Sequence, residues 1–164
     1  MIAIREVDKN DIELVSKFLA TTMEGLFPFP LTERSKKDLT EMEERFIKKK
    51  DATMIAAFLN KEVVGTIAIT RYDNRIVSIA DRYDIQTTCE VIKCYVDKNK
   101  RQQGIGSLLF NEAVNFAKQA NYVTMYLHTH RFLPGGLPFW LKKDFSIFLD
   151  EPSLLETVHM EKKI

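Results

Sequence analysis

The amino-acid sequence predicts a mixed α/β fold with a largely antiparallel sheet and one parallel pair of strands. Strand-like and helix-like apolar patterns follow one another in the order β-α-α-β-β-β-α-β-α-β-β. A strand–helix–strand unit lies between Glu90 and Thr129, and strands joined by a crossover helix pair in parallel. The chain has 164 residues, of which 45% are hydrophobic, so we expect a single domain over residues 1–164.

The first third of the sequence predicts one strand and two helices. Ile2–Val7 alternates like a short strand, and Asp8 is placed to cap a helix. The apolar face of that helix is formed by Ile12, Val15, Phe18 and Leu19. A second helix is expected from Thr32 to the lysine run Lys48–Lys50, whose charges suit a helix C-terminus.

An apolar loop, Gly25–Pro30, separates the two helices and contains Phe27 and Phe29. Aromatic side chains on a loop can form a lid or a wall of a substrate site. They can equally well fill the core between two helices. The sequence leaves both interpretations open.

The middle of the chain predicts a hairpin followed by an irregular stretch. Met54–Leu59 and Val63–Ile69 are apolar runs separated by the two-residue turn Asn60-Lys61. Ile76–Ala80 is largely apolar and could extend the meander as a further strand. Asp81–Thr88 has the composition of a polar loop.

The last part of the chain predicts four strands and two helices. Glu90–Val96 and Val123–Thr129 are strands on either side of the helix Ile105–Ala120. The inward face of that helix is predicted to hold Leu108, Leu109, Ala113, Phe116 and Ala117. A short helix over Leu137–Lys143 and two closing strands, Phe145–Leu149 and Glu156–Met160, complete the chain.

Charge and cysteine content narrow the classes of function. The 24 basic and 23 acidic residues give a net charge of +1, so no global field favours nucleic acid or an acidic membrane as a partner. Two cysteines, Cys89 and Cys94, are too few for a disulfide scaffold and indicate a reducing compartment. The sequence has no signal-peptide h-region and no apolar run of roughly 20 residues, so we expect a cytoplasmic protein.

Residues 101–107, here called the glycine loop, carry the clearest functional signal. Arg101-Gln102-Gln103-Gly104-Ile105-Gly106-Ser107 connects a predicted strand to a predicted helix. Backbone N–H groups and the helix dipole would converge there on a phosphate-type anion, and Arg101 adds a positive fork. The P-loop pattern is missing, and Leu109 stands where a dinucleotide fingerprint needs a third glycine.

The pattern Arg-x-x-Gly-x-Gly resembles the acyl-CoA pyrophosphate loop of the GNAT-type N-acetyltransferase superfamily. Glu90–Asp97 is similar to that family's central strand, and Phe139–Phe145 resembles its C-terminal Phe-Tyr-x-Lys-x-Gly-Phe element. The order of elements agrees along nearly the whole chain. The resemblance implies a GNAT-like twisted sheet whose parallel pair splays apart. It also implies direct transfer of an acetyl group from acetyl-CoA to a primary amine.

The resemblance also implies where acetyl-CoA would bind. Its pyrophosphate would meet the backbone of Arg101, Gln102, Gln103, Gly104, Ile105, Gly106 and Ser107. Its pantetheine arm would pair with the main chain of Cys94, Tyr95 and Val96 as an added strand. Trp140 stands where the family usually has the tyrosine that protonates the leaving thiolate, and an indole N–H is a poor proton source.

Glu90 and Tyr126 are the candidate catalytic residues. Glu90 occupies the position from which some family members supply a general base, with burial among apolar residues to raise its pKa. The alternative is a structural carboxylate paired with a cation such as Lys93. Tyr126, His128 and His130 share one strand face, so Tyr126 or His128 could replace the missing acid or act as base. They could also be a packed tyrosine and two histidines at the solvent edge.

No metal site is expected. Cys89 and Cys94 are five residues apart, so they point to opposite faces of one strand and cannot share a metal with His128 and His130.

Three loops are candidates for acceptor recognition: Gly25–Pro30, Arg71–Thr88 and Arg131–Gly136. Their aromatic wall would contain Phe27, Phe29, Tyr83, Phe132 and Trp140. Asp81 and Asp84 would attract a cation, which favours a small-molecule or peptide amine as the partner. Two other functions remain open, a non-catalytic acyl-CoA-binding module and transfer of a different acyl group, and the oligomeric state is open too, a homodimer included.

Overall fold

The computed structural model describes all residues, 1–164, and their contacts divide them into two units. The first unit contains Met1–Thr70 and Val91–Ala120, and the second contains Arg71–Glu90 and Asn121–Ile164. The hydrogen-bonded strand order is β1-β2-β3-β4-β5-β7-β6, and strand β4 (Thr88–Val96) belongs in part to each unit. The pair β4–β5 is parallel, which confirms the predicted mixed sheet with one parallel pair.

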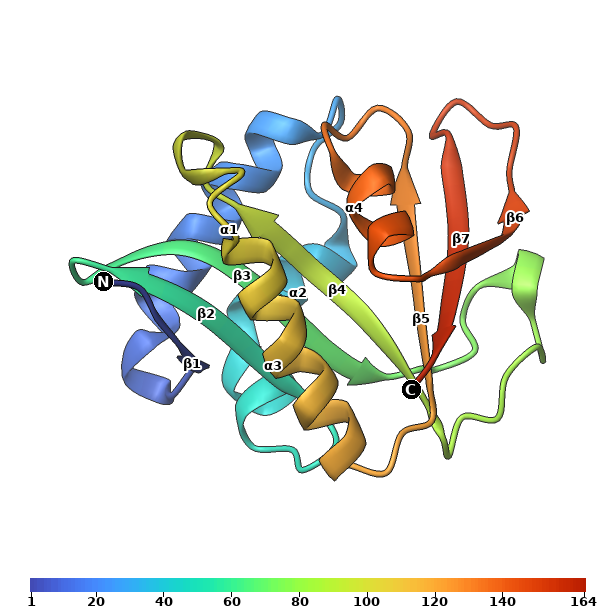
Figure 1. Ribbon diagram of the computed structural model, residues 1–164, viewed down its shortest axis with the longest axis horizontal. Helices are drawn as coiled ribbons and strands as arrows, with labels where there is room; N and C mark the ends of the chain where they lie inside the picture. The colour runs from blue at the N-terminus through green and yellow to red at the C-terminus, as the bar shows by residue number, and fades with distance from the viewer. The chain divides into compact units, whose positions relative to one another are not determined.

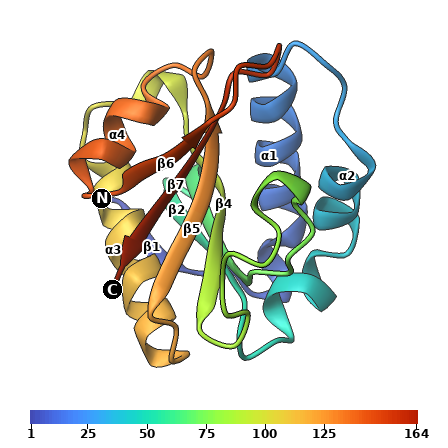
Figure 2. The ribbon, with the colours of Figure 1, turned by 90° about the vertical axis from the view of Figure 1, so that its right-hand side faces the viewer.

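The first unit is built on β1 (Ala3–Glu6), β2 (Thr53–Leu59), β3 (Glu62–Arg71) and the second half of β4. Helices α1 (Ile12–Leu26) and α2 (Glu33–Thr40) cover one face of these strands, and α3 (Ile105–Gln119) covers the other (Figures 1 and 2). The hairpin turn Asn60-Lys61 has two left-handed residues, with φ of 52° and 66°. This geometry matches the twist of the flanking strands and confirms the predicted hairpin.

Asp8 begins the first helical segment as predicted. Its carboxylate accepts a hydrogen bond from the N–H of Asn10 at 2.7 Å, and Asp11 accepts from the N–H of Asp8 at 2.9 Å. This reciprocal capping box satisfies donors that a helix start leaves without partners. Arg5 donates two hydrogen bonds to the same Asp11 carboxylate, at 2.6 and 3.0 Å, and so connects β1 to the start of α1.

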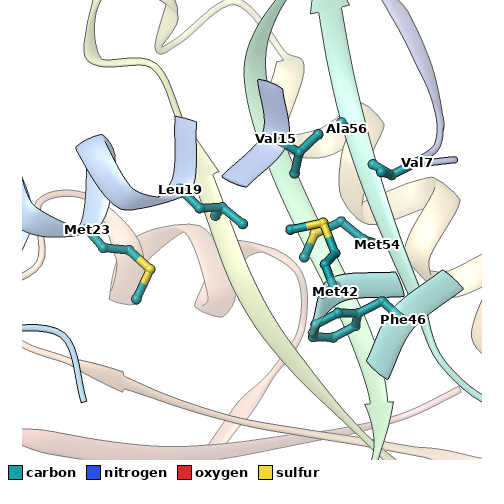
Figure 3. Packing of buried hydrophobic residues seen from close by; sticks show 9 residues of the cluster. Val7, Val15, Leu19, Met23, Met42, Phe46, Met54 and Ala56 are labelled. Atoms are coloured by element: carbon teal, nitrogen blue, oxygen red, sulfur yellow. The ribbon is translucent and has the colours of Figure 1, made fainter. Parts of the chain in front are cut away.

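The core of the first unit lies between helix α1, the π-helical segment Glu43–Ile47 and the sheet (Figure 3). Its buried members are Val7, Val15, Leu19, Met23, Met42, Phe46, Met54, Ala56 and Ala68. Phe27 packs against this cluster, and the Phe29 ring lies 5.4 Å from the Phe27 ring. Contact with the core therefore supports the core-filling interpretation for Phe27.

The helix α3 differs from its predicted inward face at one position. Leu109, Ala113 and Ala117 are fully buried as expected, whereas Leu108 is 47% exposed. Phe110 is buried in its place. Ile105 and Leu109 pack against β3 at Gly65, which has no side chain there.

The second unit contains β5 (Thr124–His130), α4 (Gly136–Lys142), β6 (Ser146–Asp150) and β7 (Thr157–Lys163). Strand β7 lies between β5 and β6 and is antiparallel to both. Helix α4 lies on one face of these strands and the segment 71–87 on the other (Figure 2). None of the helices combines the length and the apolar character of a membrane span.

Ile76–Ala80 does not extend the meander as a strand. Val77–Ile79 forms a 3₁₀ turn, Ile79 is buried against Tyr72 and Tyr126, and Val77 is 89% exposed. The side chain of Asn74 bonds the Asp81 backbone N–H at 2.8 Å and the Asp81 carboxylate at 2.9 Å. This pair closes the segment as a loop, so the backbone does not extend along a neighbouring strand.

Candidate active site

The glycine loop has the backbone shape that an anion cradle requires. Gln102 and Gly104 are left-handed, with φ of 62° and 82°, and α3 begins directly afterwards at Ile105. The first helical hydrogen bond runs from the N–H of Leu108 to the oxygen of Gly104 at 3.1 Å. Alternation of left- and right-handed residues turns successive N–H groups toward one side of a loop.

The backbone N–H groups of residues 102–107 donate no hydrogen bond to the protein. They comprise the first donors of α3, which a helix leaves without internal partners. Arg101 contributes positive charge beside them, and its Nε donates to the Val96 oxygen at 3.4 Å. The loop therefore presents a row of donors at the positive end of a helix dipole.

The strand segment Cys94–Val96 is held by its neighbours in the first unit. Lys93 is left-handed, with φ of 54°, and its oxygen accepts from the Thr66 hydroxyl at 2.7 Å. The ammonium of Lys93 pairs with the buried Asp38 carboxylate at 3.1 Å. Lys93 thus forms its ion pair with Asp38 on α2 and not with Glu90.

Glu90 lies in the second unit and is 1% exposed. Its side chain contacts charged and polar groups, whereas the sequence predicted apolar surroundings. Arg75 contacts both oxygens of its carboxylate, at 2.7 and 3.0 Å. The Nδ1 atom of His128 lies 3.8 Å from Oε2 of Glu90. The ion pair raises the pKa of Arg75, against its partial burial. Glu90 is therefore a buried, paired carboxylate.

Tyr126, His128 and His130 share one face of β5, as the sequence predicts. The Tyr126 hydroxyl lies 3.3 Å from Nδ1 of His128, and the His128 and His130 rings are 5.8 Å apart. Tyr126 is fully buried, and burial raises the pKa of its phenol. Burial lowers the pKa of His130. A buried phenol with a raised pKa is a poor independent acid, so Tyr126 depends on the groups that it contacts.

Trp140 is 6% exposed and packs in the second unit. Its ring lies 4.8 Å from Phe139 and 5.3 Å from Phe145, both edge to face. The indole thus fills the space beneath α4. This packing explains why a large apolar residue is accommodated at that position.

The aromatic residues expected to form one wall of the acceptor site lie in different surroundings. Tyr83 packs in the second unit against Tyr72, Tyr126 and Phe148, and its hydroxyl donates to Glu161 at 2.6 Å. Phe132 stacks on His130 at 5.1 Å. Asp81 is exposed and bonded to Asn74, while Asp84 is exposed and accepts from the Gln86 N–H.

Two residues that contact the candidate catalytic side chains were not predicted from the sequence. They are Arg75, which contacts Glu90, and His159, which contacts Tyr126. Arg75 lies 15 residues before Glu90, and His159 lies 33 residues after Tyr126. Only the strand register places His159 opposite His128 on the neighbouring strand. A pairing of the two strands, had it been predicted, could have found His159. No group of three or more His, Cys, Asp and Glu side chains is arranged to hold a metal ion.

Sequence and fold comparisons place the chain in a class. A family model described as the acetyltransferase (GNAT) family matches residues 19–145, which is most of the sequence. The chain therefore belongs to the GNAT acetyltransferase family. No curated protein matches its sequence.

Solved structures agree over nearly the whole length. A GNAT-family acetyltransferase of Staphylococcus aureus Mu50 matches with a TM-score of 0.79 and 21% identity, covering 99% of both chains. The PaiA N-acetyltransferase of Thermoplasma acidophilum, in complex with coenzyme A, gives 0.72 and 20%, covering 100% of this chain and 99% of that one. An aminoglycoside 6′-N-acetyltransferase complexed with coenzyme A gives 0.74 and 17%, covering 98% and 96%. At such identities the likeness concerns the fold.

Proposed function

We infer that this chain transfers an acetyl group from acetyl-CoA to a primary amine of a small molecule or peptide. The amine attacks the thioester directly while both substrates are bound. Membership of an acetyltransferase family supports this reaction class. The coenzyme A bound to two of the similar structures supports a CoA-type co-substrate. The match spans parts of both units, which supports a single catalytic domain.

The observation that carries the proposal is the glycine loop. Its N–H groups at residues 102–107 have no acceptor in the protein, and two left-handed residues shape the turn. A diphosphate supplies several anionic oxygens for such donors. The main chain of Cys94, Tyr95 and Val96 would then take the pantetheine arm.

The acceptor must lose a proton before it attacks, because an amine with a pKa of ~10.4 is almost fully protonated at neutral pH. Glu90 supplies the negative charge that makes this step favourable. The exposed acidic residues Asp81 and Asp84 of the same unit favour a cationic acceptor. A reducing, cytoplasmic location is consistent with the two free cysteines.

The test is release of CoA thiol from acetyl-CoA and from succinyl-CoA over a panel of amines, polyamines and peptides. Burial raises the pKa of the Cys89 thiol to about 12, so this thiol should react slowly with a thiol reagent. We predict amine-dependent release with acetyl-CoA. Glu90→Gln should lower turnover by about 10²-fold with CoA binding intact, because it removes the negative charge that favours proton transfer from the amine.

The matched control is Asp73→Asn, which removes the exposed carboxylate partner of Arg75 and leaves Glu90 in place. Turnover of the Asp73→Asn variant should stay near that of the parent. Equal turnover of Glu90→Gln and the parent would remove Glu90 from the reaction.

A non-catalytic acyl-CoA-binding module is the second candidate function. It is favoured by Trp140, which replaces the tyrosine that the family resemblance leads one to expect, and by the pairing of Glu90 with Arg75. Tight binding of CoA without thiol release for any amine or acyl donor would support this candidate over the enzyme.

A further inference from the structure

Five side chains of the second unit form a continuous polar path across the sheet. They are Glu151, His159, Tyr126, His128 and Glu90. The Tyr126 hydroxyl lies 2.7 Å from Nδ1 of His159 and 3.3 Å from Nδ1 of His128. His128 in turn lies 3.8 Å from Glu90, and His159 Nε2 lies 3.1 Å from Glu151 Oε1.

The strand register builds this path. His128 on β5 is directly opposite His159 on β7, and Tyr126 is two residues before His128 on the same face. The path has a buried centre and partly exposed ends. His159 and Tyr126 are 2% and 0% exposed, whereas the side chains of His128 and Glu151 are 31% and 30% exposed.

Burying a histidine and a tyrosine in contact is costly unless their polar atoms are satisfied. His159 Nε2 is buried and has no well-aligned hydrogen bond, although Glu151 is near. A polar atom left in this state inside a well-packed unit calls for an explanation beyond packing.

The single hydroxyl proton of Tyr126 gives the path a direction. When Tyr126 donates to Nδ1 of His159, its oxygen accepts a proton only from Nδ1 of His128. His159 then carries its proton on Nε2, toward Glu151. Because burial raises the pKa of Tyr126, a free phenolate is disfavoured, and the hydroxyl must gain one proton as it gives up the other.

We propose that His128 takes the proton from the acceptor ammonium and that Tyr126 and His159 conduct a proton from His128 to Glu151 at the surface. This inference rests on the proposed transfer of an acyl group to an amine. His128 is the catalytic base, and Tyr126 and His159 are positioning residues that act through it. Glu90 stays charged and stabilises the imidazolium of His128.

The proton balance closes along the path. The N–H bond of the ammonium breaks and its proton joins Nε2 of His128, while the Nδ1 proton of His128 moves to the Tyr126 oxygen. The Tyr126 hydroxyl proton passes to Nδ1 of His159, and the Nε2 proton of His159 passes to Glu151 and then to water. No oxidation occurs, and only the acceptor and the solvent change their proton count.

The charged groups at the two ends of the path are consistent with this direction. Glu90 on β4, which Arg75 pairs, faces His128, and His130 flanks it on β5. A hydrogen bond from Ser78, followed by the contact with His159, lowers the pKa of Glu151. Glu151 is thus a carboxylate at neutral pH and can receive the proton.

The test compares Tyr126→Phe with Tyr72→Phe in the pH profile of kcat/KM. The Tyr72 ring lies 5.4 Å from Tyr126 in the same cluster, and its buried hydroxyl has no hydrogen-bond partner. Tyr126→Phe should lower kcat/KM at neutral pH by about 10²-fold. Its activity should then rise about tenfold per pH unit toward the pKa of the free amine. Tyr72→Phe should keep the profile of the parent.

A second measurement is independent of activity. Nitrogen chemical shifts of the histidine rings report which nitrogen carries the proton, and His159 should change its tautomer balance in Tyr126→Phe but not in Tyr72→Phe. His159→Gln, measured in parallel, should reproduce the altered pH profile of Tyr126→Phe.

The outcomes distinguish failure of the proton path from failure of the proposed function. An active parent whose Tyr126→Phe and His159→Gln variants keep its pH profile would overturn the proton path and leave the transferase intact. Unchanged histidine shifts in Tyr126→Phe would overturn it as well. A parent that binds CoA but transfers to no amine would reject the proposed function itself and, with it, the role of the path.

Discussion

Glu90 carries a buried negative charge that Arg75 meets at both carboxylate oxygens. Removal of one partner from a buried ion pair leaves the other charge without compensation. The loss of stability is then larger than the net stability that the intact pair contributes. The geometry therefore argues that Glu90 works as a fixed charge. Its sequence position alone left both a free general base and a paired carboxylate open, because Arg75 is distant in the chain.

The Glu90–Arg75 pair leads to a prediction about stability. Glu90→Gln should lower the free energy of unfolding by about 3 kcal/mol, because it leaves the Arg75 guanidinium unpaired on its buried side. Asp73→Asn, which removes the more exposed partner of Arg75, should cost less than about 1 kcal/mol. Urea unfolding of the three proteins at pH 7 measures both differences. Equal losses would show that burial of Glu90 carries no special weight.

Asp11 gives a prediction that depends on pH. Its hydrogen bond from Arg5, with a further one from the Asp8 backbone, lowers the pKa of its carboxyl. A lowered pKa in the folded state stabilises the protein above the pKa of the unfolded chain, and the effect disappears as the pH falls through the folded pKa. Asp11→Asn should therefore cost about 2 kcal/mol at pH 7 and almost nothing once Asp11 is protonated.

Thermal unfolding of parent and Asp11→Asn between pH 2 and 7 checks this expectation. Glu13→Gln, an exposed acidic residue in the first turn of α1, serves as control and should change stability by at most about 1 kcal/mol. A constant difference in stability between the parent and Asp11→Asn over the whole pH range would show that ionisation of Asp11 does not stabilise the fold.

At the scale of elements, α3 approaches β3 closely at Gly65. An added Cβ would lie 3.0 Å from Leu109 Cδ1, 3.2 Å from the Tyr95 oxygen and 3.3 Å from Ile105 Cγ2. These neighbours belong to the helix that begins at the glycine loop and to the strand segment proposed to bind pantetheine. The contact thus connects packing in the first unit to the shape of the proposed CoA site.

Gly65→Ala should destabilise the protein by about 1–3 kcal/mol through overpacking, and it should weaken CoA binding because Ile105 is displaced. Gly25→Ala is the control, because nothing lies within 4 Å of a Cβ there and the residue is in α1. It should be neutral or stabilising by up to about 1 kcal/mol. Chemical denaturation and CoA titration of both variants test the contrast. A Gly65→Ala variant as stable as the parent would contradict the close packing.

The helices and most strands could be predicted because their signals are local. Asp8 caps its helix by a short-range hydrogen bond, and two apolar runs on either side of Asn60-Lys61 mark the hairpin. The segment 76–80 could not be predicted correctly. Its β-branched residues favour a strand, whereas the Asn74–Asp81 pair and burial of Ile79 under the tyrosine cluster impose a 3₁₀ turn.

The site was predictable in the same uneven way. The glycine loop is contiguous, so its residues were found together. The partners of Glu90 and Tyr126 come from other segments, and their contacts depend on the register of β5 with β7 and on the path of the loop 71–87. No spacing within the sequence encodes the contacts of Arg75 or His159.

At the scale of the whole molecule, membership of the GNAT acetyltransferase family and the unpaired amides of the glycine loop lead to the same expectation. The chain should bind CoA through its diphosphate. A ligand that binds only the folded protein also raises its stability, by about 2.7 kcal/mol at 100 times the dissociation constant. The proposed reaction, its acceptor class and the proton path all depend on this first binding step.

Isothermal titration calorimetry with coenzyme A tests this central claim most directly, on the parent and on two glycine variants. Gly104→Ala and Gly135→Ala both place an alanine at a left-handed helix start, with φ of 82° and 74°, where a Cβ has open space. Both should lose about 1 kcal/mol of stability through backbone strain. We expect saturable binding of one CoA to the parent and to Gly135→Ala, and weaker binding to Gly104→Ala. Absence of heat with the parent at millimolar CoA would contradict it.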